Sequence, residues 1–145
     1  MKKLLFMLLL VAATLPGWAD ETQLTIIGGA TSVGWWTDSG QAESQREYQR
    51  TVGRMVRTEE NIWVWIGTLK TGDNDAGNFK ITNGSGNQAW DGYWATTANE
   101  EVGSKESQTF TLATANNGDK KFHVTATGMY RITIDLSETT KKMKV

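Results

Sequence analysis

The sequence contains no cysteine and only one histidine, His123. Without cysteine the chain forms no disulfide framework, no thiolate metal site and no cysteine nucleophile, and no lipid-bearing cysteine is present. The single histidine lies between two apolar residues of a predicted strand, a position more typical of a sheet face than of a catalytic base. Phosphate-binding loops, G-x-S-x-G elbows and clustered metal-ligand motifs are absent as well. These absences argue against an enzyme, a cofactor and a metal site. In the oxygen-rich segment Asp73-Asn74-Asp75 we expect a plain turn, with a calcium site as the alternative.

An excess of positive charge is also missing. The chain has 15 basic and 16 acidic residues, and removal of Lys2 and Lys3 with a leader leaves 13 basic residues and a net charge of −3. Proteins that bind nucleic acid need a basic patch to replace the counterions of the phosphates. The composition therefore predicts no nucleic-acid partner.

No apolar run is long enough for a membrane span, but a short one begins the chain. Two lysines precede eight apolar residues at positions 4–11, and Gly17 and Ala19 supply the small residues that a signal peptidase reads. The run is about half of the ~20 residues that cross a bilayer. We predict a signal peptide over 1–19 and an exported protein that is periplasmic, secreted or associated with the cell surface.

Apolar and polar residues alternate with a period of two through residues 20–145, with many Thr, Val, Ile and aromatic residues. This length is typical of one domain. The short predicted strands and frequent turns favour an all-β fold, an antiparallel β-sandwich of immunoglobulin-like type. Strands are predicted at 24–28, 61–70, 78–82, 88–95, 107–113, 121–126, 129–136 and 142–145.

Two connections stand out in this pattern. Residues 39–60 are polar and charged, which predicts a long connection or insert, with a short helix over 43–57 as the alternative. The pair Asn117 and Gly118 is a strong signal for a β-hairpin between the strands on either side of it.

Six tryptophans follow the predicted leader, several times the ordinary frequency. Trp63 and Trp65 share one face of the clearest strand with Leu69, so we expect both to be packed in the core. Trp35 and Trp36 are adjacent and face opposite ways in an extended chain. We expect Trp35 to pack under its loop and Trp36 to be exposed.

The last two tryptophans belong to a loop-like cluster, Trp90-Asp91-Gly92-Tyr93-Trp94, which follows Asn87. Indole and phenol rings give a large contact area with few frozen torsions, and amide and carboxylate neighbours suit sugar hydroxyls. The cluster indicates carbohydrate binding. An aromatic plug beneath a long loop is the alternative.

Three blocks in order resemble the starch-binding outer-membrane proteins of the SusE/SusF type. An opening I-I-G-G-A-T followed by G-W is similar to their first motif. W-I-G-T-L with G-N-F-K-I matches their middle motif, and G-M-Y-R-I-T-I-D-L matches their last. These blocks begin at Ile26, Trp65, Gly77 and Gly128. Together they span nearly the whole chain after the leader.

The resemblance implies a non-catalytic, carbohydrate-binding-module-like sandwich that captures a polysaccharide or oligosaccharide, for which an α-glucan is the family's ligand. Carried onto this sequence, the resemblance places Trp36, Lys80 and the segment from Trp90 to Trp94 at the binding face. With Asn87 from the loop cluster, the predicted binding residues are Trp36, Lys80, Asn87, Trp90, Asp91, Tyr93 and Trp94. The resemblance also implies outer-membrane glycan-uptake proteins as partners.

Two other functions remain open. Exposed tryptophans also serve as hot spots between proteins, so an exported protein-binding, adhesin or assembly domain is the main alternative. Glycoside hydrolysis needs two carboxylates facing each other across a cleft. Candidates lie in predicted loops, but no spacing singles out a pair: Asp73, Asp75, Asp91, Glu100 and Glu101.

Overall fold

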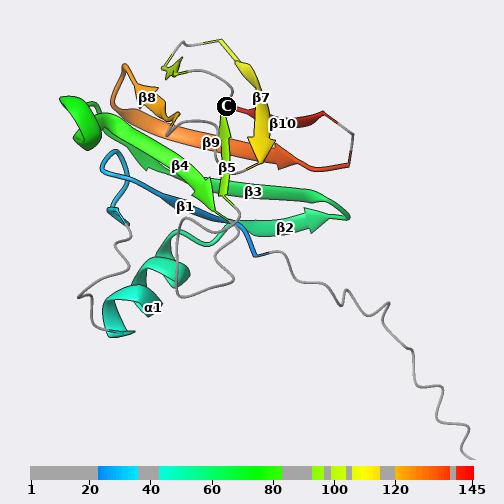
Figure 1. Cartoon of the computed structure of the whole chain (residues 1–145), viewed down its shortest axis with the longest axis horizontal. Coiled ribbons are helices and arrows are strands. Elements are labelled where there is room, and N and C mark those ends of the chain that lie inside the picture. The colour runs from blue at the N-terminus through cyan, green and yellow to red at the C-terminus, as the bar shows by residue number, and fades with distance from the viewer. Residues whose placement is uncertain are drawn as a thin grey trace, which may run out of the picture.

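The protein is an all-β sandwich, as the strand pattern predicts (Figure 1). The computed structural model describes residues 23–35, 43–82, 93–96, 99–103, 106–114, 120–137 and 140–145. The elements in chain order are β1 (Thr25–Ile27), α1 (Glu43–Val52), β2 (Val56–Glu59), β3 (Ile62–Leu69), the 3-10 turn η1 (Asn74–Gly77), β4 (Asn78–Thr82), β5 (Tyr93–Thr96), β6 (Glu100–Val102), β7 (Thr109–Thr114), β8 (Phe122–Val124), β9 (Gly128–Asp135) and β10 (Lys141–Lys144).

The strands follow one hydrogen-bonded path, β2-β3-β9-β10-β7-β5-β4-β8-β6, and β1 pairs with the other edge of β4. Every pair is antiparallel except β6 with β8. The five strands from β2 to β7 form one half of the sandwich, and β5, β4, β8 and β6 with β1 form the other. Side chains from both halves make one continuous core.

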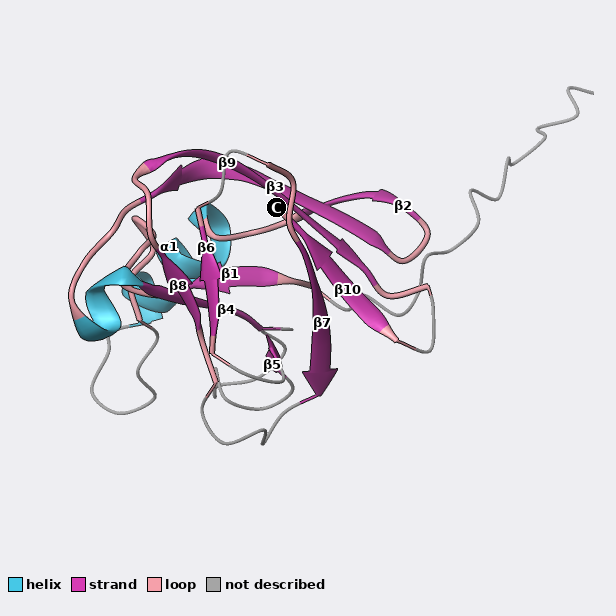
Figure 2. Ribbon diagram, turned by 90° about the horizontal axis from the view of Figure 1, so that it is seen from above, coloured by secondary structure: helices cyan, strands magenta, loops and turns pink. Residues whose placement is uncertain are grey.

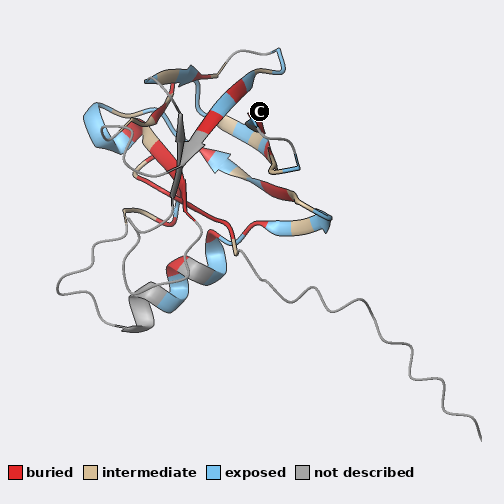
Figure 3. Ribbon diagram, turned by 45° about the vertical axis from the view of Figure 1, so that its right-hand side comes forward, coloured by how far each residue is buried: buried red, intermediate tan, exposed pale blue. Residues whose placement is uncertain are grey.

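Aromatic and β-branched residues fill this core because alternate residues of each strand face inward. Phe79 of β4 stacks on Phe122 of β8 with ring centroids 5.1 Å apart. Phe110 of β7 meets Phe122 edge to face at 5.4 Å and so joins the two halves. Trp63 and Trp65 of β3 are only 4% and 8% exposed, which confirms their predicted place in the core. Figure 3 shows the buried residues gathered between the halves.

The segment 39–60 is more ordered than a plain connection. It contains helix α1 and strand β2, which pairs with β3 through a register shift. The chain after α1 is anchored to β1, since Gly53 O accepts a hydrogen bond from Ile26 N at 2.8 Å and Met55 N donates to Leu24 O at 2.9 Å. The short helix that the sequence left as the alternative is therefore present, and the edge strand was not predicted.

The hairpin predicted at Asn117 and Gly118 is wrong, although those two residues lie outside the described part of the chain. The flanking strands β7 and β8 do not pair with each other. β7 pairs with β10 and β5, and β8 pairs with β4 and β6. β7 and β8 therefore belong to different halves of the sandwich.

Gly28, from the opening apolar-glycine motif, lets β1 end close against β4. Its φ is +141°, and a Cβ placed there would lie 2.3 Å from the carbonyl oxygen of Asn78. Only glycine accommodates both the backbone conformation and this close approach. The start of β4 is fixed in this way, and β4 supports the site described next.

Candidate functional site

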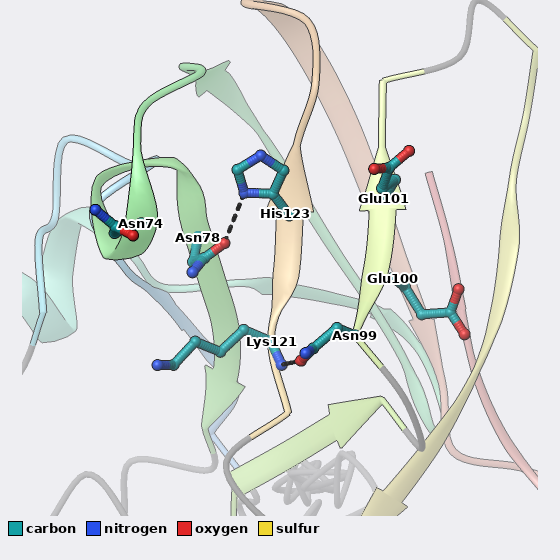
Figure 4. A pocket seen from close by; sticks show the side chains of 7 residues that line it. All are labelled: Asn74, Asn78, Asn99, Glu100, Glu101, Lys121 and His123. Carbon is teal, nitrogen blue, oxygen red and sulfur yellow. Dashed lines mark hydrogen bonds between the residues drawn. The ribbon is translucent and has the colours of Figure 1, made fainter.

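A polar pocket of about 400 Å³ lies on the outer face of β4, β8 and β6, beside η1 (Figure 4). The three strands are neighbours in the sheet, and Figure 2 shows them side by side. Every lining side chain is polar: Asn74, Asn78, Asn99, Glu100, Glu101, Lys121 and His123.

Strand register explains why these residues meet. Asn78 is paired with His123, and Glu101 is paired with His123 from the other side. Cross-strand partners share a face of the sheet. The neighbouring residues Phe122 and Val124 are buried in the core, so His123 faces outward, as its strand position predicts. Asn78, His123 and Glu101 therefore share the polar outer face of three strands, whereas Glu100 pairs with Phe122 and reaches the pocket from the edge strand β6.

An ion pair on one side of the pocket joins η1 to the chain just before β8. Lys121 Nζ lies 2.9 Å from Asp75 Oδ1. The same ammonium lies 5.7 Å from the ring centroid of Trp35, whose Nε1 donates a hydrogen bond to Asp75 O at 3.0 Å. Trp35 is half-buried. It packs against η1, which is 40 positions away in the chain, and it also takes part in a cation–π contact with Lys121.

The hydrogen bonds of Asn78 determine the tautomer of His123. Asn78 Nδ2 donates to Asp75 Oδ1 at 3.4 Å, so Asn78 Oδ1 is the atom that faces His123. His123 Nδ1 lies 2.9 Å from that oxygen and must carry the proton. In the neutral ring Nε2 is then the acceptor. The imidazole thus offers one oriented acceptor for a ligand hydroxyl.

The remaining amide and carboxylate groups complete a mixed set of donors and acceptors. Asn99 Oδ1 accepts a hydrogen bond from Lys121 N at 3.3 Å, which leaves its Nδ2 to donate elsewhere. Glu100 and Glu101 are consecutive residues of β6 and project to opposite sides of the strand. They are therefore not a carboxylate pair facing each other across a cleft.

Among the residues that the structure describes, no three His, Cys, Asp or Glu side chains are grouped as metal ligands would be. The same residues include no helix that is both long and apolar enough to cross a bilayer.

The predicted binding site is wrong at Lys80. The sequence places it on an exposed surface beside the aromatic cluster, but its side chain is 1% exposed. β4 is covered on both faces: Phe79 and Ile81 face the core, and Lys80 lies on the opposite face with Thr82, which is also buried. The alternation was right, but the segment that covers the second face was not foreseen. Lys80 therefore cannot contact a polysaccharide on the surface.

The other predicted binding residues fall largely outside the described part of the chain. Trp36, Asn87, Trp90 and Asp91 are not described. The backbones of Tyr93 and Trp94 belong to β5, which pairs with Thr82 and Ile81 of β4. β5 and β8 pair with the same edge of β4. β5 therefore brings the end of the aromatic segment next to the strands of the polar pocket in the sheet.

Sequence reasoning missed the pocket residues Asn78, Asn99 and Lys121 as a group. They are spread over 44 positions, 78 to 121, in segments that the sequence does not show to be neighbours. The parallel pairing of β6 with β8 brings Asn99 beside Lys121, and the pairing of β4 with β8 adds Asn78. No local pattern signals these pairings.

Comparison of the chain with protein-family models, with curated proteins and with solved structures found no match in any of the three. The function is therefore argued from the site itself.

Proposed function

We propose that the protein is a non-catalytic carbohydrate-binding domain, exported through its N-terminal leader, whose polar pocket on β4, β8 and β6 grips the hydroxyls of a polysaccharide or oligosaccharide. The observation that carries the proposal is the composition of the pocket. Three carboxamides, an imidazole, an ammonium and the carboxylate of Glu101 line a single depression, with Glu100 at its edge. Sugar rings present many hydroxyls, each of which donates and accepts, and they require such a mixed set.

The place of the aromatic segment supports the same function. β5, which carries Tyr93 and Trp94, continues along the edge of β4 that β8 occupies at Asn78. From Asn78 to Ile81 is three residues, about 10 Å along a strand. That separation is on the scale of two linked sugar rings. Lys80 and Thr82 are buried on the outer face of β4, so a ligand held in the pocket does not run across that face. Stacking on the aromatic segment is therefore proposed as a second contact, which the tryptophan variants test.

The proposal retains the wider expectation from the resemblance. We infer that the protein serves glycan capture in a manner similar to the SusE/SusF type, with outer-membrane glycan-uptake proteins as partners. A protein-binding or adhesin function is the second candidate.

Affinity electrophoresis in gels cast with starch, dextran, xylan or mannan tests the function. The wild-type protein is expected to be retarded by at least one of these polymers. A double variant, His123→Ala with Asn99→Ala, is expected to weaken binding about tenfold, since each hydrogen bond contributes about 0.5–1.5 kcal/mol. Trp90→Ala and Trp94→Ala are expected to weaken it at least tenfold if their rings stack on the sugar.

Thr111→Ala is the matched control, because Thr111 is exposed on β7, outside the pocket. Its retardation should equal that of the wild type. A folded protein that no polymer retards would contradict carbohydrate binding and favour a protein partner. If only the tryptophan variants lose retardation, the protein still binds carbohydrate, but the polar pocket is not the binding site.

A further inference from the structure

A second depression lies at the opposite end of the strand order from the polar pocket. It has a volume of about 490 Å³ and is formed by the C-terminal end of α1 with β2, β3 and β9. We call it the arginine groove. Its lining residues are Val52, Arg54, Val56, Thr58, Val64, Trp65, Ile66 and Arg131.

The groove has an exposed apolar rim and a deeper apolar floor. Val56 and Ile66 are each 65% exposed, whereas Val64, on the same face of the sheet, is 8% exposed and forms the floor. The indole of the neighbouring Trp65 faces the core. Large exposed aliphatic side chains gathered around one depression are unusual on a monomeric surface and mark a binding surface.

The charge of the groove has one sign. Arg54 and Arg131 are exposed, and the structure gives neither guanidinium a hydrogen bond or ion pair with any residue it describes. Arg131 is paired with Ile66 across β3 and β9, so the cation and the rim residue share a face. No carboxylate is among the lining residues. In a protein whose predicted mature charge is negative, this is a local reversal of sign.

We propose that the arginine groove binds a single-chain anionic amphiphile, an apolar chain that ends in a carboxylate. The chain would lie over Val64 between the rim residues Val56 and Ile66, and its head group would meet the guanidinium groups. Arginine presents a planar fork of donors that matches a carboxylate. The volume is within the range of small-molecule sites, about 300–1,000 Å³.

The same charges disfavour a second copy of this chain as the occupant. A two-fold contact through the groove would place Arg131 and Arg54 against the same residues of the other copy. Like charges brought together at an interface oppose association.

Isothermal titration calorimetry with dodecanoate, kept below its micelle concentration, tests the proposal. The wild-type protein should bind it, and Arg131→Gln and Arg54→Gln should each weaken binding about tenfold. Ile66→Asn should also weaken it, and the fold should survive because the side chain is exposed. Dodecyltrimethylammonium has the same chain with a cationic head and should not bind.

Lys144→Gln is the matched control. Lys144 is exposed and lies opposite Thr133, on the same sheet face as Arg131, but does not line the groove. Removing its charge should leave dodecanoate affinity unchanged. Glycan retardation should be unchanged in all the groove variants, so the two proposals fail or stand separately.

Three results would overturn the proposal. The first is equal affinity for the cationic and anionic amphiphiles, which would show nonspecific apolar binding. The second is an Arg131→Gln variant as tight as the Lys144→Gln control. The third is binding to phosphatidylglycerol vesicles without binding to dodecanoate, which would assign the surface to a membrane.

Discussion

The indole of Trp65 lies over Gly67, two residues further along β3. A Cβ built on Gly67 would be 2.4 Å from Cζ2 of the indole and 2.5 Å from Cη2. The tryptophan thus occupies the space that a side chain at position 67 would need. The block W-I-G-T-L contains both partners because the large ring and the absent side chain are complementary. Close packing of this kind tolerates little added volume.

Gly67→Ala is therefore expected to destabilise the protein by about 1–3 kcal/mol, the usual cost of overpacking. Urea denaturation followed by circular dichroism measures it. Gly128→Ala is the control, because Gly128 lies across from Leu69 and a Cβ there would meet only a Tyr130 ring atom at 3.8 Å. Equal stability of the two variants would show that the indole moves aside freely.

Trp65→Ala removes the other partner and should cost about 3–5 kcal/mol, as large-to-small core substitutions do. Trp65 is 8% exposed and belongs to the main core cluster. The same denaturation experiment applies, and the midpoint should fall while the slope stays constant. A loss below about 1 kcal/mol would mean that the ring contributes little to the core.

Thr25→Val is expected to leave stability unchanged or raise it by about 1 kcal/mol. Thr25 is fully buried, and its Oγ1 has no hydrogen-bond partner among the described residues. A buried hydroxyl without a partner costs free energy that a methyl group does not.

Thr31→Val is the contrasting substitution. Thr31 Oγ1 donates to Gly28 O at 2.8 Å and accepts from Val33 N at 3.1 Å. Replacing Thr31 by valine should destabilise the protein by about 1–3 kcal/mol, because the buried Gly28 carbonyl and Val33 N–H lose their hydrogen-bond partner. Thermal denaturation of the two variants side by side gives the comparison, and the reverse order would contradict it.

Tyr130 should make stability fall at alkaline pH. Burial raises the pKa of its phenol above 10.0, and its hydroxyl donates to Ala126 O at 2.5 Å. The unfolded chain then ionises at lower pH than the folded protein. This contribution is fully present below pH 10 and is lost as pH rises through the folded pKa.

Tyr130→Phe removes this contribution along with the hydrogen bond. The variant should be less stable by about 1 kcal/mol at pH 7, and the difference from wild type should shrink above pH 10. Denaturation midpoints measured from pH 7 to pH 11 test it. If the stability difference between the variant and the wild type stays constant over that range, the phenol has the same pKa in the folded and unfolded states.

Much of the fold was readable from local pattern. Residues of β3 and β9 alternate so regularly that their inward faces, with Trp63, Trp65, Ile132 and Ile134, follow from period two alone. Strand β6 and the edge strand β2 were not predicted, because three or four residues with few apolar side chains carry too little signal. Their strand conformation depends on the neighbours they pair with.

The candidate site was likewise predicted only in part. His123 was placed correctly on an outer face because its neighbours Phe122 and Val124 are apolar. The face on which Lys80 lies was also predicted correctly, but its exposure was not. Alternation shows which face of a strand a residue lies on, and it does not show whether another segment covers that face.

By itself the sequence determined that the chain forms strands, which faces of them are apolar, and that thiol chemistry is excluded. Those properties depend on residues close together in the chain. Tertiary structure alone decided that β7 and β8 lie in different halves and do not pair as a hairpin. It also decided that Asn78, Asn99 and Lys121 line one pocket. Pairing between distant strands is set by how the two halves share one core, and no stretch of neighbouring residues encodes it.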